Sequence, residues 1–337
     1  NIINKGDIQF GMNYRYFRGT EEEPDRITSN TEVINYSDST DFFLTYGINE
    51  REYTSITLPT IFNSRSSLYE LGREERNTTF SRGLGDIRLG VGFWLFDLEK
   101  HKNGNLAVGL GFKLPTENYN ASDIFYNVGP NDEPQTRPVD QSIQTGDRDF
   151  GFKADFQLYQ KIVNGLFGHA SGFYLLNPRE TNGIRTFRET LSPLLENEAI
   201  MAVPNQYSIR TGISYNNSPS ISSSIGTRFY CVPVRDLTSG NNGFRKPGSV
   251  LSKDPGIGLN KNNFSFNLNI PFAIRRERLQ SITDIQTEQS TGTPRHIDTA
   301  FTDYAINFGV TYRIINNKVK ISPEFLDEFK KQHFYTF

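Results

Sequence analysis

The segment 85–96, GDIRLGVGFWLF, constrains this chain most, because its side chains alternate between two faces with a period of two. The apolar face carries Ile87, Leu89, Val91, Phe93 and Leu95. The other face carries Asp86, Arg88, Gly90, Gly92 and Trp94. This alternation predicts a β-strand whose two faces meet two different surroundings.

The same alternation recurs along most of the chain. It is clear in the segments 7–17, 42–49, 52–62, 105–114, 149–159, 206–215, 221–231, 264–272 and 303–314. In the segment 165–176 the two faces are ambiguous. In the segment 275–287 the pattern is weak, and we place a strand there mainly because an even strand count requires one. Together these segments predict twelve strands.

The links between the strands alternate strictly between short and long. Short links such as 47–52 and 215–220 alternate with long polar ones at 19–40, 64–83, 116–146, 177–204, 236–260 and 288–300. This arrangement is typical of bacterial outer-membrane barrels. The predicted fold is therefore all-β, an up-and-down antiparallel transmembrane β-barrel of twelve strands. An even count places both chain ends on the short-link side, which is the periplasm in such barrels.

A barrel also settles what each strand face meets. The apolar face meets lipid and the polar face meets the barrel interior, and closure is required because hydrocarbon offers no partner for a free strand edge. A soluble β-sandwich has alternating strands too. Strands of about ten residues favour the membrane barrel, since globular strands are usually about 5–6 residues long.

The amino-acid composition narrows the class of protein further. Hydrophobic residues form 36% of the chain and its mean hydropathy is −0.53, which excludes a helical membrane protein. The abundance of Phe (27), Tyr (16) and Gly (28) suits strands with one apolar face and long polar loops. A net charge of −2 argues against a nucleic-acid partner, and the single Cys231 excludes an intramolecular disulfide. Because the chain begins at Asn1 without a methionine, we expect a processed form.

Four stretches, at 46–62, 83–96, 105–119 and 143–162, come in the order of a family signature. They resemble the bacterial outer-membrane proteins described as transporters of the MetA pathway of phenol degradation, distant relatives of the channels for fatty acids and aromatic hydrocarbons. The best anchors are strand-end and turn residues: Gly83-Leu84-Gly85-Asp86, Leu114-Pro115-Thr116 and Thr145-Gly146. The resemblance implies the barrel and a transport role. Because the first strand begins near residue 7, we expect no N-terminal plug like that of the fatty-acid channels.

The C-terminal part divides the chain into a barrel, 1–315, and a periplasmic tail, 316–337. The last strand resembles the assembly signal of outer-membrane barrels, with Gly309, Tyr312 and Ile314 at its spaced positions. In the tail, SPEFLDEFKK predicts a short C-terminal periplasmic helix capped by Ser322. One face of that helix carries Phe325, Leu326 and Phe329. The helix either packs on the periplasmic rim or serves as a plug or docking helix below the lumen.

The alternation of side chains between the two faces of each strand predicts which charged residues line the lumen. These are Arg15, Asp86, Arg88, Lys113, Lys153, Asp155, Arg210, Arg228, Asp303 and Arg313. One reading is a network of ion pairs that fills the interior. The other is a polar conduit with a mild cationic bias, which would prefer small anionic or aromatic acid solutes. The sequence leaves both open.

Enzymatic and metal sites have little support in the sequence. None of the four histidines lies in a metal-ligand spacing, so we predict no metal and no cofactor. His169 and Ser171 share a strand face, as in a Ser–His hydrolase, but residues two apart on a strand lie about 6.5–7 Å apart. The acid clusters at 21–25 and 146–149 offer ligands to calcium but lack the spacing of an EF-hand loop, so solvated loop charge is predicted there.

Two functions remain. The first is an outer-membrane channel or transporter for small hydrophobic, aromatic or anionic solutes. The second is a non-conducting barrel that acts as a structural or docking subunit for other outer-membrane or periplasmic proteins. Outer-membrane lipid and lipopolysaccharide are the predicted partners in both. What fills the lumen separates them, and the loop 116–146 is the one most expected to fold inward.

Overall fold

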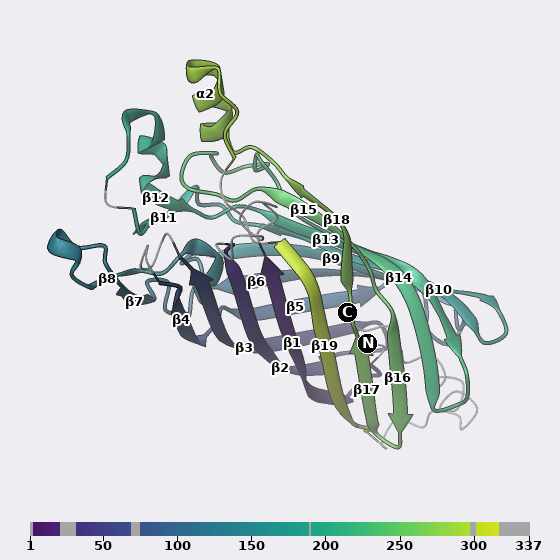
Figure 1. Ribbon diagram of the computed structural model, residues 1–337. Coiled ribbons are helices and arrows are strands. Elements are labelled where there is room, and N and C mark those ends of the chain that lie inside the picture. The colour runs from purple at the N-terminus through teal and green to yellow at the C-terminus, as the bar shows by residue number, and fades with distance from the viewer. Residues whose placement is uncertain (1–2, 21–31, 69–74, 189, 297–300, 317–337) are drawn as a thin grey trace.

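The computed structural model describes residues 3–20, 32–68, 75–188, 190–296 and 301–316. They form a closed antiparallel barrel (Figure 1). Its wall has twelve segments that each run from one end of the barrel to the other, and we call each segment, whether one strand or two in line, a pass. Closure comes from β19 (Phe301–Ile314), which pairs with β1 (Ile8–Thr20) along its whole length. The passes between them are β2 (Ile34–Gly47), β3 (Glu52–Ser67), β4 (Asn77–Leu84) with β5 (Ile87–Trp94), β6 (Gly104–Leu114), β9 (Gly151–Val163), β10 (Leu166–Leu176), β13 (Gln206–Asn216), β14 (Ile221–Val232), β15 (Gly248–Lys253) with β16 (Gly256–Lys261), and β17 (Phe264–Asn269) with β18 (Phe272–Arg278). The predicted barrel is confirmed.

The outward face of the wall is apolar. Large exposed side chains come from passes all around the barrel, for example Phe10, Leu44, Ile56, Leu89, Leu110, Phe152, Ile209, Ile225, Ile257 and Phe264. On β5 the split follows the prediction, since Leu89 and Val91 are exposed whereas Trp94 is buried inside. Apolar surface costs roughly 25 cal/mol per Å² in water, so this face suits hydrocarbon.

Three passes are interrupted at a turn-forming pair of residues. The pairs are Gly85-Asp86, Asp254-Pro255 and Ile270-Pro271. In the two pairs that contain proline, the ladder breaks because proline has no N–H to donate to the neighbouring strand. Neighbouring carbonyls keep the wall bonded across the gaps: Asp254 N donates to Gly226 O at 2.9 Å, and Ile270 N to Pro255 O at 3.1 Å.

The strand predicted at 275–287 is wrong. Residues up to Arg278 belong to β18, which continues the pass of β17, and Ser281 then caps the helix α2 (Ile282–Thr291). Ser281 and Asp284 form a capping box, each side chain accepting a hydrogen bond from the other residue's backbone N–H. The missing pass, β15 with β16, lies inside the link predicted at 236–260, where SKDPGIG looks like a turn. The two errors cancel in the count of twelve.

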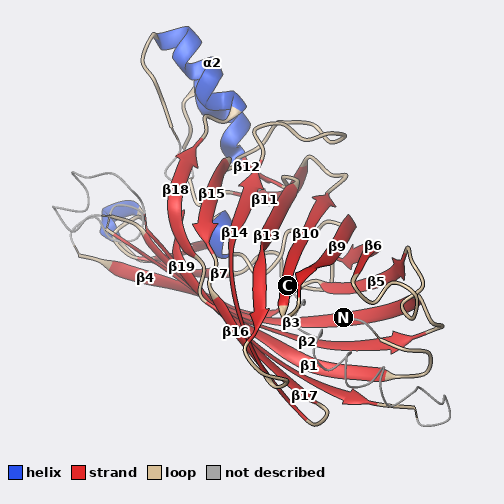
Figure 2. Cartoon of the chain, turned by 90° about the vertical axis from the view of Figure 1, so that its right-hand side faces the viewer, coloured by secondary structure: helices blue, strands red, loops and turns tan. Residues whose placement is uncertain are grey.

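The long links gather at one end of the barrel, which we call the long-loop end. They carry two hairpins, β7 (Ser122–Phe125) with β8 (Gln135–Pro138) and β11 (Thr181–Arg185) with β12 (Ile200–Ala202), and the short helices η1 (Pro130–Asp132), η2 (Gln141–Ile143) and η3 (Pro193–Ala199). Figure 2 shows α2 beyond the ends of β15 and β18, at the opposite end from the turn between β16 and β17. Arg295 fastens α2 to the loop of η3, with Nη1 2.7 Å from both Glu198 Oε1 and Asp284 Oδ1. No described helix has the length and apolar character needed to cross a membrane.

The first and last described residues of the barrel meet at its other end, the short-turn end. Arg313 Nε donates to Asp7 Oδ2 at 2.9 Å, and Asn316 N donates to Asp7 Oδ1 at 2.8 Å. The predicted tail helix with Phe325, Leu326 and Phe329 lies outside the described residues. The division into 1–315 and 316–337 therefore stays a prediction.

Candidate functional site: the barrel lumen

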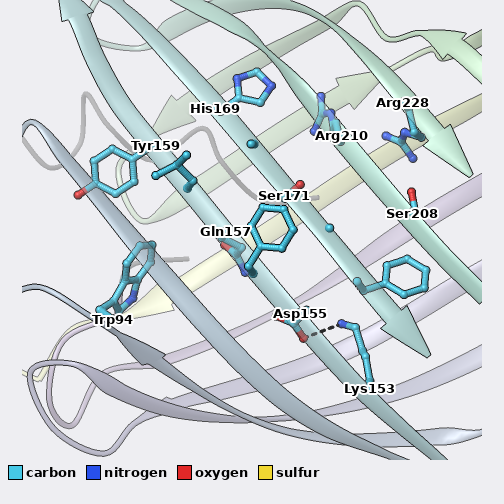
Figure 3. A pocket seen from close by; sticks show the side chains of 15 residues that line it. Trp94, Lys153, Asp155, Gln157, Tyr159, His169, Ser171, Ser208, Arg210 and Arg228 are labelled. Atoms are coloured by element: carbon cyan, nitrogen blue, oxygen red, sulfur yellow. Dashed lines mark ion pairs between the residues drawn. The ribbon is translucent and has the colours of Figure 1, made fainter. Parts of the chain in front are cut away.

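A cavity of about 240 Å³ lies inside the barrel against the inner face of β9, β10, β13 and β14 (Figure 3). Its polar side chains are Lys153, Asp155, Gln157, His169, Ser171, Ser208, Arg210 and Arg228, and its aromatic ones are Trp94, Tyr159 and Phe173, joined by parts of Phe156, Leu158, Ala170 and Gly172. An engineered cavity of roughly 150 Å³ accepts benzene. The lumen cavity therefore has room for a single aromatic ring with a polar substituent.

Two arginines beside the cavity share one carboxylate. Arg210 Nε lies 2.7 Å from Asp254 Oδ2, and Arg228 Nη2 lies 3.0 Å from the same oxygen. Asp254 is fully buried at the interruption of the tenth pass. One carboxylate cannot neutralise two guanidinium groups, so this group carries a net positive charge.

Two further ion pairs are more exposed to water. Arg88 Nη2 lies 2.6 Å from Asp41 Oδ2, and Lys153 Nζ lies 3.0 Å from Asp155 Oδ2. The Arg88 side chain is 44% exposed and that of Lys153 40%. Exposed ion pairs of this kind are worth about 0–1 kcal/mol, because water screens them. Both cations therefore stay available to a solute in the lumen.

Arg15 adds a positive charge that forms no ion pair within the described part of the chain. It faces inward from β1 and is exposed to the lumen. It lies within electrostatic range of Asp41, which binds Arg88, and of Arg228 and Tyr230 on β14, four passes away around the ring. Among the described residues, five cations thus face three carboxylates in the middle of the lumen.

His169 and Ser171 both line the cavity, which resolves the faces of the segment 165–176. The imidazole lies over Gly212 on the neighbouring strand, where a Cβ atom would come within 3.0 Å of His169 Cε1. Glycine at 212 leaves room for this ring and for the neighbouring backbone, since the same Cβ atom would lie 2.6 Å from Ile225 O.

An aromatic cluster lines the lumen at the short-turn end, on the neighbouring passes of β3, β5, β6 and β9. Trp94 packs edge-on against Tyr159 with 5.9 Å between ring centres, and Leu98, Ala107 and Tyr53 complete the cluster. The sequence placed Trp94 inward but gave no sign that Leu98, which lies in the turn after β5, folds back beneath it.

The long-loop end is crossed by the residues 139–145, which we call the crossbar. On one side of the barrel, Asn63 Nδ2 donates to Ile143 O at 3.1 Å, and Asn35 Nδ2 donates to Ser142 Oγ at 3.0 Å. On the other side, Gln141 Nε2 donates to Ala202 O at 2.6 Å. The prediction that the loop 116–146 folds inward is confirmed.

Asp140 is the charged centre of the crossbar. It accepts from Lys246 Nζ at 2.8 Å and lies 3.9 Å from Arg65 Nη2, and both Arg65 and Asp140 are nearly fully buried. Burial opposes ionisation of Asp140, but Arg65 and Lys246 outweigh it and hold the pKa of this carboxyl well below its ordinary value. The sequence missed Arg65 because the link predicted at 64–83 treated the last residues of β3 as loop.

The remaining predicted lumen residues lie in ion pairs towards the barrel ends. Lys113 lies between Asp86 and Asp147, and Arg313 binds Asp7. Asp303 binds Arg18 and Arg276 where the register of β1 against β19 shifts. Of the ten predicted residues, the structure brings Arg15, Arg88, Lys153, Asp155, Arg210 and Arg228 together in the middle of the lumen, and leaves the other four apart from it.

Comparisons with known proteins give a fold and no family. No family model and no curated protein matches the chain. The COG4313 outer membrane channel from Pseudomonas putida F1 superposes with a TM-score of 0.58 at 11% identity, covering 93% of this chain and 97% of that one. The translocator domain of the autotransporter NalP from Neisseria meningitidis gives 0.47 at 13% identity, over 93% and 90%. The CymD monoaromatic hydrocarbon channel gives 0.44 at 9%, also over 93% and 90%. The first of these likenesses shows a shared barrel fold.

Proposed function

We propose that this chain is an outer-membrane channel for small anionic and aromatic solutes, with the long loops outside the cell and both chain ends in the periplasm. One observation carries the proposal: the lumen cavity lies beside a surplus of positive charge among the described residues, in which Arg210 and Arg228 share Asp254, and Arg15 forms no ion pair of its own. The barrel from Pseudomonas putida that shares this fold is described as an outer membrane channel.

The cavity suits a solute that is both aromatic and negatively charged. Its carboxylate would bind the guanidinium groups of Arg210 and Arg228, which offer charge-assisted hydrogen bonds. Its ring would lie against Phe173 or against Trp94 and Tyr159, where aromatic rings pack favourably. Most ligand sites combine an apolar lining with a few directed polar groups in this way.

A non-conducting scaffold is the second candidate, and both ends of the lumen favour it. The crossbar runs across the long-loop end, and the aromatic cluster narrows the short-turn end from one side. A channel needs a path past both places, whereas a scaffold does not. Neither function requires catalysis by His169 and Ser171, which line the cavity.

Ion selectivity tests the proposal. The full chain is refolded into a planar bilayer, and its reversal potential is recorded in a salt gradient. We expect steady current with a preference for anions, and a shift towards cations when Arg15 and Arg228 are both replaced by alanine. The control is Lys100→Ala, which removes one positive charge from a turn where the side chain is 80% exposed.

The outcomes separate the two functions. A folded wild-type barrel that carries no current supports the scaffold. Current without anion preference, or a preference unchanged in the double variant, contradicts the assignment of the lumen cations. Benzoate that blocks chloride current in the wild type and not in the double variant would support an aromatic acid as solute.

A further inference from the structure

Three turn motifs that are far apart in the sequence meet at one place inside the long-loop end. They are the Gly85-Asp86 interruption, Thr116-Glu117 after β6, and Gly146-Asp147 before β9. Thr116 Oγ1 accepts from Ile87 N at 2.9 Å, and Glu117 Oε1 accepts from Arg148 N at 2.6 Å. A Cβ atom at position 146 would overlap the Glu117 side chain, so glycine there lets Glu117 tuck under the returning loop. Together the three motifs enclose a small acidic site.

The site holds three carboxylates and one ammonium group. One oxygen from each of Asp86, Glu117 and Asp147 lies within 4.8 Å of the others. Lys113 Nζ lies 2.5 Å from Asp147 Oδ1 and 3.7 Å from Asp86 Oδ2. Three ionised carboxylates and one lysine leave two negative charges uncompensated. The segment 146–149 was predicted to be solvated loop charge, and this is wrong at Asp149, which is 1% exposed.

Two oxygens in this site have no hydrogen-bond partner among the described residues. Glu117 is 8% exposed and its Oε2 atom is buried and unpartnered, and Asp86 Oδ1 is a buried, unpartnered atom as well. The Arg148 side chain is turned away, because its Nη1 donates to Asn182 O at 3.2 Å and its guanidinium lies over the Tyr119 ring. Burial raises the pKa of Glu117. An unpartnered buried carboxylate oxygen is unfavourable unless a cation or a proton binds it.

We propose that Asp86, Glu117 and Asp147 bind one calcium ion, with Lys113 turning aside from Asp86 as it enters. A divalent cation matches the two uncompensated charges. The donors are all carboxylate oxygens, which calcium prefers, and calcium tolerates irregular sites better than magnesium does. Asp86 belongs to the wall, while Glu117 and Asp147 belong to the outgoing and returning legs of the loop that carries the crossbar. Calcium would therefore clamp both legs of this loop to the barrel.

The proposal is tested on the full chain refolded in a zwitterionic detergent and freed of metal with a chelator. Calcium chloride is titrated in by calorimetry at pH 8, with magnesium chloride in a parallel titration. We expect one equivalent of calcium with magnesium at least tenfold weaker, and at least a tenfold loss of calcium affinity in Glu117→Gln and in Asp86→Asn. The matched control is Glu133→Gln, because Glu133 lies in the same loop and is exposed.

A fourth variant tests whether Lys113 competes with calcium or only supports the fold. Lys113→Gln removes the competing cation and is expected to tighten calcium binding and to raise the melting temperature only when calcium is present. No binding up to about 5 mM calcium at pH 8 would overturn the proposal. Equal binding by Glu117→Gln and by the wild type would overturn it too, since the ion would then lie elsewhere.

Discussion

The two ends of the lumen are narrowed by opposite kinds of chemistry. At the short-turn end, Trp94, Tyr159 and Leu98 pack together as buried apolar groups. At the long-loop end, the crossbar is held by hydrogen bonds and by the charges of Arg65, Asp140 and Lys246. The aromatic cluster consists of strand residues and one turn residue, Leu98, whereas the crossbar is a segment of one long loop.

This difference bears on which end opens more easily. Water replaces a hydrogen bond to a loop at a net cost of about 0.5–1.5 kcal/mol, because the freed groups are solvated. Water gives no such compensation to a buried indole ring, whose exposure costs about 25 cal/mol per Å². We therefore expect the long-loop end to open and close, and the short-turn end to be a fixed constriction.

Trp94→Ala is expected to have the largest effect. Trp94 is 2% exposed and is the centre of the cluster, so its loss should lower the free energy of unfolding by about 3–5 kcal/mol. It should also raise single-channel conductance by widening the constriction. Unfolding is followed by circular dichroism, because replacing Trp94, the chain's single tryptophan, removes the tryptophan fluorescence signal.

The control for this variant is Leu237→Ala, at a loop position that is 74% exposed. If Trp94→Ala unfolds like the wild type and conducts like it, the aromatic cluster is not the constriction.

Asp140→Asn tests the other end and is expected to have the next largest effect. The amide keeps the shape of the side chain but removes the negative charge that faces Arg65 and Lys246. Breaking a tight buried pair costs about 3–5 kcal/mol. We expect about 2 kcal/mol here, because Arg65 stands 3.9 Å away and also donates to Asn35 Oδ1 at 3.1 Å. Conductance should rise through more frequent opening, seen as longer open times rather than a larger unit current.

Asp132→Asn is the control, since Asp132 lies exposed in the same loop. A larger unit current in Asp140→Asn with unchanged open times would contradict a moving crossbar, because it would mean a fixed obstacle has been removed.

Acid should weaken the same contact, over a defined range of pH. The pKa of Asp140 is lower in the folded chain than its unfolded value of about 3.9, so ionised Asp140 stabilises the fold fully above that value. Its contribution falls as the pH drops below about 4 towards the folded pKa. The difference in unfolding free energy between wild type and Asp140→Asn should thus be constant from pH 8 to 5 and shrink below pH 4. A difference that already shrinks between pH 7 and 5 would show that Arg65 and Lys246 do not act on Asp140 as described.

The wall was predictable from the sequence, because the alternation along a strand and the lengths of the links are local properties. Where a strand is interrupted, the local pattern fails. The pass through Asp254 and Pro255 looked like a loop, although Pro255 only breaks a ladder that continues on both sides. The segment after Arg278 looked like a strand by counting, and the capping box at Ser281 made it a helix instead.

The candidate site was predictable only in part, for a related reason. Parity identified Arg210 and Arg228 but not Asp254, which they share and which lay in a predicted loop. Arg65 was missed in the same way. The crossbar and the acidic site at Glu117 depend on where a long loop folds, and no periodicity within the loop carries that information.

Lys153→Ala is expected to have the smallest effect, and it measures how much of the lumen charge is available to solutes. Lys153 pairs with Asp155 on its own strand, and with a side chain 40% exposed the pair should contribute at most about 1 kcal/mol to stability. Removing the ammonium group leaves Asp155 unopposed, so anion preference should fall slightly, by less than in the Arg15 and Arg228 double variant. The Lys153→Ala, Asp155→Asn double variant keeps the net charge and should restore the wild-type reversal potential. If Lys153→Ala instead abolished anion preference while the Arg15 and Arg228 variant kept it, the solute path would run along β9 rather than past the arginines of β13 and β14.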